Sequence, residues 1–366
     1  MAREFGADLR DVIEKPGPFV SLYLNTEAAR EEGPDEIALR WRGLRDTAVE
    51  AGATEPMLEV VDSIVADSHR KGNGLAVIAS DEGILLRRHL SRPVADDVAV
   101  GPVPRLLPLV EWTQENPRYV VALVDREGGE IHVVSGHTIE DTETVEGDTD
   151  PIQKVHAGGW SMRRFQNRAE NNWEANAKAV ADELGKMVSA EEVDFVVLAG
   201  DVRAVQFLEE NAPQEVDAIT FGLGSSPATG IEDIQEELDK AAAAFVGRTV
   251  EELLEKFQEE RGQNDLACEG KEEIFAALAK AQVETLLIAR GRVDDPAFFS
   301  KRDLTQAGLD RRALAELGLS DLDEAPAEDV LVRTALGTGS RVVVIPDLSK
   351  VHGPREGVGG LLRYAL

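Results

Sequence analysis

The chain has 366 residues, of which 43% are hydrophobic and 30% are charged, and its formal net charge is -30. This length and composition predict a globular protein of two or three domains, and they exclude both a single small module and a disordered chain. No apolar run is long enough to span a membrane and residues 1–10 lack the pattern of a secretory signal, so we expect a soluble cytoplasmic protein without a membrane partner.

Residues 1–116 have the pattern of a mixed α/β N-terminal domain. The β-rich run at residues 17–27 predicts a buried strand, and apolar residues at helical spacing predict a long helix after it and a second helix at about residues 54–66. Two β-rich runs within residues 74–90 predict a hairpin. Residues 101–112 are interrupted by proline and lead to the end of the domain.

Residues 117–262 have the pattern of an α/β middle domain with a protruding glycine-rich loop and a long helix. Residues 118–136 give the strongest hairpin signal in the chain. The acid-rich run at residues 137–151 predicts a polar connection that leads to the loop. The elements expected after it are a helix over about 165–187, a strand at 193–200, a helix at 201–210, a strand at 216–221 and an acidic helical region at 231–260.

Residues 263–366 again alternate helices with buried strands, which predicts an α/β/α C-terminal domain. A charged connection is expected over about 291–326, and the glycines Gly357, Gly359 and Gly360 indicate a turn before an edge strand. The other elements expected are helices at 271–281 and 327–336 and strands at 283–290, 341–346 and 357–366.

The run from Ile152 to Ala169 contains no carboxylate, although the chain has 69 acidic residues against 39 lysines and arginines. Adjacent glycines let a backbone approach an RNA closely and adopt positive φ, and the amides at a helix start, together with arginines, are donors suited to phosphate oxygens. We therefore predict a local RNA-binding tip on an acidic protein. Its candidate residues are Lys154, His156, Gly158, Gly159, Trp160, Ser161, Arg163, Arg164 and Arg168.

Two other interpretations of this run stay open. It is a glycine-rich or buried turn that happens to be basic, or its arginines pair with Glu170, with Glu174 or with the acidic run before them. If Ser161 or a neighbouring residue caps the helix, Arg164 and Arg168 share one helix face and Arg163 projects about 100° away.

The sequence gives little support for a metal site, a cofactor site or a catalytic nucleophile. The sequence has no HExxH, a second cysteine for CxxC is lacking, and residues 222–230 lack the lysine that ends a phosphate-binding loop. Cys268 stands beside Glu269 without a nearby base, which raises the pKa of a thiol, so we interpret it as structural. We expect no metal site and no cofactor.

The sequence resembles the archaeal and eukaryotic class-1 peptide release factors, with Pelota and the bacterial release-factor-like proteins. The release-factor pattern Gly-Gly-Gln-Ser, followed by a hydrophobic pair and Arg-Phe, is similar to the run from Gly158 to Phe165, with Arg168 further along the stalk. The family's closing Gly-Gly-x-Leu-Arg-Tyr is similar to the run from Gly359 to Tyr364. The segments "YVVALVDREGGEIHVV" and "EEIFAALAKAQVETLLIA" resemble the starts of the family's second and third domains.

The chain departs from the family at Trp160, where release factors carry the glutamine that acts on the peptidyl-tRNA ester. An indole has one N–H donor and cannot replace an amide, although it can stack on a base or ribose. The resemblance implies a three-domain protein shaped for the ribosomal A site, with rRNA and tRNA as partners and with a translational GTPase such as EF-Tu beside it. The nearest functional analogy within the family is the Balon-like ribosome hibernation factors, which lack the glutamine.

Our first hypothesis is therefore a non-enzymatic ribosome-associated factor that acts in ribosome hibernation or stress. The alternative is an enzyme, either a peptidyl-tRNA hydrolase or a tRNA-cleaving rescue factor, with His156 and Ser161 as catalytic candidates and Arg163 or Arg164 stabilising phosphate charge. A third hypothesis is a scaffold that reuses the fold without RNA, because fold does not fix function.

Overall fold

The structure is a computed structural model, and it places the chain in two compact units. Residues 115–247 form the first unit almost entirely, and residues 3–114 with 248–366 form the second. Both units combine helices with β-sheets, which confirms the predicted α/β class. The residues described are 9–27, 33–136, 138–147, 159–191, 193–211, 218–222, 230–263, 266–293, 295–346 and 353–365, with the backbone alone at 159–171 and 218–222.

The first unit is built on a five-stranded sheet with the order β7-β6-β5-β8-β9. Strands β6 and β7 continue antiparallel from β5, whereas β8 and β9 run parallel to it because helices connect them. The strands are β5 (Arg118–Val124), β6 (Gly128–Ser135), β7 (Thr138–Glu146), β8 (Phe195–Gly200) and β9 (Ala218–Gly222); the helices are α5 (Gly159–Ala190), α6 (Val202–Asn211), η1 (Ile231–Ile234) and α7 (Gln235–Gln263).

Alternation along β5 sends its apolar residues to both faces of this sheet. Val120, Ala122 and Val124 belong to the core under α5 and α6. Tyr119 and Val121 belong to the core under η1 and the first half of α7, where Tyr119 stacks on Phe195 at 4.7 Å between ring centroids. A strand that is buried on both faces needs this unbroken apolar run.

The prediction that residues 137–151 form only a connection is wrong, because most of this run is the edge strand β7. This strand pairs with β6 from Ser135↔Thr138 to Gly128↔Glu146, with one register shift between Val133 and Val134. Nearly all of β7 is exposed. Charged side chains on an edge strand keep it from pairing with other chains, so the acidity of the run is compatible with strand structure.

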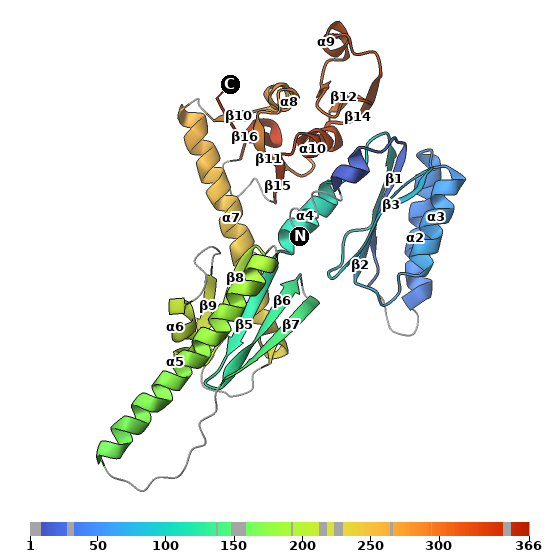
Figure 1. The fold of residues 1–366 in the computed structure, drawn as a ribbon. Helices are drawn as coiled ribbons and strands as arrows, with labels where there is room; N and C mark the ends of the chain where they lie inside the picture. The colour runs from blue at the N-terminus through green and yellow to red at the C-terminus, as the bar shows by residue number, and fades with distance from the viewer. Residues whose placement is uncertain are drawn as a thin grey trace. The chain divides into compact units, whose positions relative to one another are not determined.

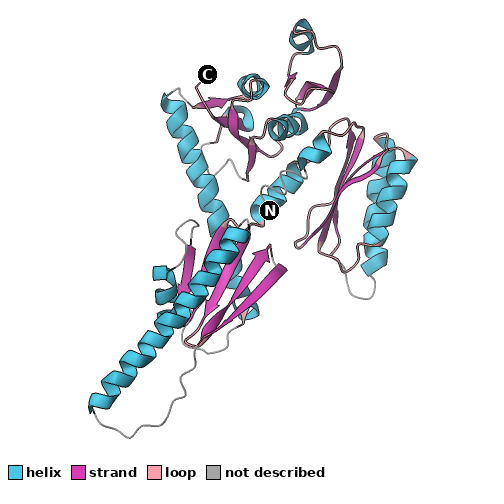
Figure 2. Ribbon diagram, viewed as in Figure 1, coloured by secondary structure: helices cyan, strands magenta, loops and turns pink. Residues whose placement is uncertain are grey.

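The N-terminal part of the second unit is a four-stranded antiparallel sheet with the order β3-β2-β1-β4 (Figures 1 and 2). The predicted hairpin at residues 74–90 is confirmed as β2 and β3. Two helices cover one face through apolar residues such as Trp41 and Leu58. The elements are β1 (Phe19–Asn25), α2 (Gly33–Glu50), α3 (Glu55–Ala66), β2 (Gly74–Ser80), β3 (Gly83–Leu90), β4 (Asp97–Gly101) and α4 (Leu107–Glu115).

Two elements of this part are absent from the sequence prediction, namely β4 and α4. Strand β4 is partly exposed along its length and pairs with β1. Helix α4 begins at Leu107 and has Pro108 in its first turn, where proline is tolerated, whereas proline is not tolerated inside a helix. Its residues Leu107, Leu109 and Val110 lie in the core on the second face of the sheet.

The C-terminal part of the second unit is a sheet with the order β10-β16-β11-β15, covered on both faces as predicted. The second half of α7 packs on one face through Val250, Leu254 and Phe257. Apolar residues of α8 and α10 pack on the other. The elements are β10 (Ala267–Glu269), α8 (Lys271–Ala279), β11 (Val283–Ala289), α10 (Ala327–Gly337), β15 (Arg341–Ile345), η2 (Arg355–Gly357) and β16 (Val358–Leu362).

The prediction that residues 291–326 form only a charged connection is also wrong. They contain a small sheet with the order β13-β12-β14 and a short helix. The sheet strands are too short and too polar on one side to show clear periodicity in the sequence. The elements are β12 (Pro296–Ser300), β13 (Ala307–Gly308), α9 (Arg311–Glu316) and β14 (Leu322–Pro326).

The strand after the glycine turn is not an edge strand, because β16 lies between β10 and β11. Gly357 does form a turn, with a φ of +75°. A Cβ at Gly359 would lie 2.9 Å from the ring of Phe257 on α7, and a Cβ at Gly360 would lie 3.0 Å from Ile274 on α8. The two glycines therefore let helices approach this strand closely from both faces.

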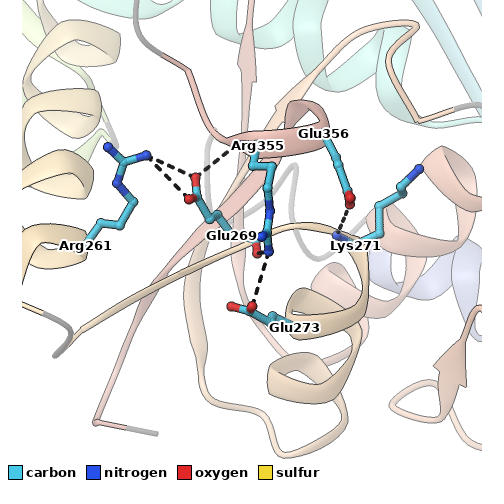
Figure 3. A network of polar contacts seen from close by, with 6 residues as sticks. All are labelled: Arg261, Glu269, Lys271, Glu273, Arg355 and Glu356. Atoms are coloured by element: carbon cyan, nitrogen blue, oxygen red, sulfur yellow. Dashed lines mark hydrogen bonds and ion pairs between the residues drawn. The ribbon is translucent and has the colours of Figure 1, made fainter.

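A network of charged side chains joins the end of α7 to β10, α8 and η2 (Figure 3). The carboxylate of Glu269 accepts from Arg261 at 3.2 Å and from the backbone N–H of Arg355 at 3.0 Å. The Arg355 guanidinium also contacts Glu273 at 3.2 Å, and Glu356 accepts from a backbone amide of α8 at 3.0 Å. These exposed pairs position η2 before β16, and each adds little stability on its own.

Candidate RNA-binding site

Helix α5, at whose amino end the predicted RNA-binding tip lies, extends beyond the sheet that supports it. It has 32 residues, which corresponds to a length of about 48 Å. Figure 1 shows its first half running past the strands of the unit, while its second half lies along the sheet. In that second half a stripe at helical spacing is buried on the sheet, comprising Ala177, Val180, Ala181, Leu184 and Val188.

The helix begins at Gly159, so the predicted start at Phe165 is wrong. Glycine is tolerated there because the first N–H groups of a helix have no partner within the helix. Ser161 accordingly lies inside the first turn and is not the residue that caps the helix. The structure describes the backbone, but not the side chains, of the predicted site residues Gly159, Trp160, Ser161, Arg163, Arg164 and Arg168. Lys154, His156 and Gly158 lie outside the described residues.

The helix backbone brings two of the predicted positions together. Positions 164 and 168 are one turn apart on one side of α5, and position 163 is about 100° away. Counting at about 100° per residue from Ala177, positions 164 and 168 fall on the side opposite the stripe that packs on the sheet. This part of the helix therefore combines a projecting backbone with arginine at positions that the sheet does not cover.

The described side chains anchor α5 where it meets the sheet. The guanidinium of Arg126, in the turn between β5 and β6, lies 4.5 Å from the ring centroid of Trp173. The side-chain amide of Asn176 donates to the Arg126 carbonyl at 3.0 Å. Arg126 also pairs with Asp201 at 3.3 Å, and the Asp201 carboxylate accepts from the first amides of α6. One turn thus fixes both helices on this face of the sheet.

Close backbone contacts make the anchor rigid. Gly147 packs against Asn176, and a Cβ at this glycine would lie 2.3 Å from the amide carbon. Gly128 has a φ of +154°, and a Cβ there would lie 2.1 Å from the carbonyl oxygen of Val145. Asp125 accepts from the amides of Glu127 and Gly128 at 2.7 and 2.9 Å. The turn has little freedom to change its shape, so it holds the base of α5 in one place.

A second set of contacts fixes the other end of α5. Arg118, at the start of β5, pairs with Glu140 of β7 at 2.8 Å and with Glu191 after α5 at 2.5 Å. Burial opposes its charge, but the hydrogen bonds that it donates to these carboxylates dominate and hold the pKa of Arg118 above its ordinary value. The arginine therefore stays charged and joins two strands to the end of the helix.

Sequence reasoning missed this anchor. Arg126, Trp173 and Asp201 are far apart in the chain, and no motif connects them. Trp173 lies four residues after the acid-free run that ends at Ala169, and the signal in the sequence was an aromatic residue on a polar helix. Their contact depends on the pairing of β5 with β8 and on the line that α5 takes across the sheet.

The closing segment that resembles the release factors has a structural role. Arg363 donates to the carbonyls of Ala281, Thr338 and Gly339 at 3.0, 3.2 and 2.8 Å. The hydroxyl of Tyr364 donates to the carbonyl of Lys280 at 3.1 Å. These carbonyls lie at or just beyond the C-terminal ends of α8 and α10, where backbone acceptors lack partners within the helix. The segment therefore caps two helices.

Cys268 is buried in the core of the C-terminal sheet. Burial, together with the carboxylate of Glu273, raises the pKa of its thiol to about 12. The predicted direction is correct, although the acidic neighbour is Glu273 and not Glu269. Among the described residues, no group of three or more His, Cys, Asp or Glu side chains is arranged to hold a metal ion, and no described helix is long and apolar enough to cross a membrane.

Comparison with known proteins finds a family model similar to residues 118–263. These residues match the model of Bacterial archaeo-eukaryotic release factor family 2. Over 365 residues the chain is 29% identical to the uncharacterized protein Rv2629 of Mycobacterium tuberculosis H37Rv, a match that covers 98% of this chain and 96% of the relative.

Solved structures of lower similarity include two archaeal proteins. An archaeal translation termination factor, aRF1, has 16% identity over 99% of this chain and 98% of its own, with a TM-score of 0.24. A chain in a model of ribosome-bound archaeal Pelota and ABCE1 has 15% identity over 99% of this chain and 94% of its own, with a TM-score of 0.39. The family match concerns residues 118–263: this segment is similar to the bacterial family of archaeo-eukaryotic release factors.

Proposed function

We propose that the protein is a ribosome-associated translation factor that occupies the A site in ribosome hibernation or stress and does not hydrolyse the peptidyl-tRNA ester. The observation that carries this proposal is the acid-free, arginine-bearing run at the projecting amino end of α5 in a chain of net charge -30. RNA binding there depends on local charge, because the mean field of the protein repels phosphates. The family match over the same segment supports the proposal.

In this proposal the chain has three functional domains. Residues 117–262 direct the tip of α5 to the peptidyl-transferase centre, where Lys154, His156 and the residues from Gly158 to Arg168 contact rRNA or tRNA. Residues 1–116 face the decoding region of the small subunit. Residues 263–366 contact a protein partner, by analogy a translational GTPase such as EF-Tu.

Trp160 is the reason for proposing an occupant and not a hydrolase. It replaces the glutamine of the release factors, and an indole offers one donor where the amide offers two donors and an acceptor. Its flat ring suits stacking on an exposed base or ribose, an interaction that tolerates any base. Stable binding without turnover is the expected consequence.

Co-sedimentation with ribosomes from stationary-phase cells tests the proposal. The wild-type protein is expected to pellet with ribosomes, and Arg164→Glu with Arg168→Glu is expected to weaken binding about tenfold or more, because it replaces two phosphate contacts by repulsion. The matched control is Lys178→Glu with Lys186→Glu, which makes the same charge change on the exposed side of the packed half of α5. Absence of wild-type enrichment at low salt would reject the proposal, and so would equal loss in both variants.

Stalled ribosome complexes separate the proposed occupant from the enzymatic alternative. Incubation with the protein is expected to release no peptide and to leave the tRNA full length. Peptide release or tRNA cleavage that disappears in His156→Ala or Ser161→Ala would favour the hydrolase or nuclease in place of the occupant.

A further inference from the structure

The N-terminal sheet carries a second concentration of positive charge, on residues that the α5 site does not include. We call the set Arg70, Lys71, Arg87 and His89 the β3 basic face. Arg70 and Lys71 follow the end of α3, and Arg87 and His89 lie on the edge strand β3. Two separate segments thus bring basic residues together in a protein of net charge -30.

Strand pairing puts these residues on one side of the sheet. Arg87 pairs with Val77 and His89 pairs with Leu75, and both partners belong to the core under α2 and α3. Arg87 and His89 therefore point to the side of the sheet on which α3 ends. Backbone contacts bring the two segments together, since the N–H of Asn73 donates to the carbonyl of Leu90 at 2.8 Å and a Cβ at Gly72 would lie 3.4 Å from the Cβ of His89.

Lys71 and Arg87 differ in their contacts with carboxylates. Lys71 pairs with Asp67 one helical turn away. Arg87 is exposed, and within the described residues no carboxylate pairs with it. His89 is partly buried, its Nδ1 has no hydrogen-bond partner there, and burial together with Arg87 and Lys71 lowers the pKa of its ring. Like charges held together on a rigid edge are relieved when an anion approaches.

We propose that the β3 basic face binds the phosphate backbone of an RNA helix. The inference deepens the proposed function, on which it rests, by adding an RNA contact on a different sheet from α5. Arginine and lysine are the residues that neutralise phosphates, and an RNA helix presents its phosphates in rigid rows. An acidic peptide presents its carboxylates on side chains that lose rotamer freedom when they are fixed, so the pre-arranged cations suit RNA better.

Protection of the sheet edge is the other role that charges on β3 can have. The two roles respond differently to charge reversal. Glutamate on β3 protects the edge as well as arginine does, because any charge opposes strand addition, but it repels phosphate. A reversal variant that stays monomeric and folded therefore isolates the RNA contact.

The test measures binding of the full-length protein to a fluorescein-labelled A-form RNA duplex of about 20 base pairs by anisotropy over a series of KCl concentrations. The test variant is Lys71→Glu with Arg87→Glu. The control is Lys15→Glu with Arg42→Glu, which makes the same charge change at two exposed positions of the same part of the chain. Circular dichroism and sedimentation confirm that each variant is folded and monomeric to the same extent as the wild type.

The test variant is expected to bind the duplex at least about tenfold more weakly than the wild type, and the slope of its log affinity against log salt concentration is expected to be smaller by about two. The control variant is expected to lose much less affinity. Equal losses in both variants would show a response to net charge alone and would overturn the inference. An unchanged affinity in the test variant would do the same, as would displacement of the duplex by polyglutamate at lower charge concentration than by unlabelled RNA.

Ribosome pelleting in parallel keeps the two proposals separate. Weaker duplex binding by the test variant, with no ribosome association by the wild type, retains the β3 basic face and rejects the proposed function. The opposite result is ribosome association that is lost in the Arg164→Glu, Arg168→Glu variant, together with duplex binding that is unchanged in the Lys71→Glu, Arg87→Glu variant. It retains the proposed function and rejects the β3 basic face.

Discussion

The guanidinium of Arg126 lies 4.5 Å from the ring centroid of Trp173. This contact joins the turn between β5 and β6 to the point where α5 leaves the five-stranded sheet. Everything on α5 before Trp173 extends from this anchor. The direction of the projecting half is therefore set by a turn that is itself tied to α6 through Asp201.

Removing the ring at Trp173 should loosen the base of α5. Trp173→Ala eliminates the cation–π contact, and we expect a loss of about 1 kcal/mol in the free energy of unfolding, together with faster amide hydrogen exchange in residues 172–180. Chemical denaturation and hydrogen exchange measure the two effects. Lys178→Ala, on the exposed side of the same helix, is the control and should change neither. Unchanged exchange in the tryptophan variant would mean that the contact does not hold the helix.

Stability should depend on pH through Asp329, in the first turn of α10. Its carboxyl is buried, one oxygen has no hydrogen-bond partner among the described residues, and the other lies 3.8 Å from Arg105. Burial raises the pKa of Asp329 to about 7 from 3.8, with Glu328 and Asp97 adding to the rise and Arg105 opposing it.

The sign follows from where the proton is held. Below about pH 4 the carboxyl is protonated in the folded and unfolded chains alike, but between about pH 4 and pH 7 only the folded protein keeps the proton, so stability falls through this window as pH rises. The decrease in the free energy of unfolding is complete above about pH 7 and is on the order of 4 kcal/mol. Asp329→Asn should remove this component and stabilise the protein at pH 8, as denaturation at several pH values will measure. Asp46→Asn, at an exposed position of α2, should leave the pH profile as in the wild type.

Replacing the glycines of β16 by larger residues should destabilise the protein. Gly359→Ala places a methyl group 2.7 Å from Pro354 and 2.9 Å from the fully buried ring of Phe257, so we expect destabilisation by about 1–3 kcal/mol. Gly247→Ala, in α7, meets no atom within 4 Å and should stabilise the protein by about 0.5–1 kcal/mol. Thermal denaturation distinguishes the two, and a stabilising effect at Gly359 would contradict the close packing of α7 on this strand.

The thiol of Cys268 should react slowly in the folded protein. It is the one cysteine of the chain, so any thiol signal reports on it. With a pKa of about 12, roughly one thiol in 10,000 is ionised at pH 8, and the side chain is buried. Alkylation by iodoacetamide is expected to be slow under native conditions and to reach the rate of a free thiol in denaturant. Rapid native modification would show that the C-terminal core opens readily.

The sequence by itself determined most helices and the buried strands, because apolar periodicity reports directly on burial. It also located the arginine-bearing run, since an acid-free stretch is conspicuous in an acidic chain. It failed where periodicity was weak or charge misleading: the acidic edge strand β7, the short strands between residues 296 and 326, and the helix start at Gly159. Each of these depends on a neighbouring strand or on unpaired helix amides, which no local pattern reveals.

Only the tertiary structure decided which distant residues meet. Arg126 reaches Trp173 and Asp201, Gly72 lies beside His89, and Gly359 lies under Phe257 because strand pairing and helix packing bring separate segments together. Residue type sets what a side chain can do, and periodicity sets which way it faces within its own element. Contacts between elements follow from the register and order of the sheets, which are properties of the whole fold.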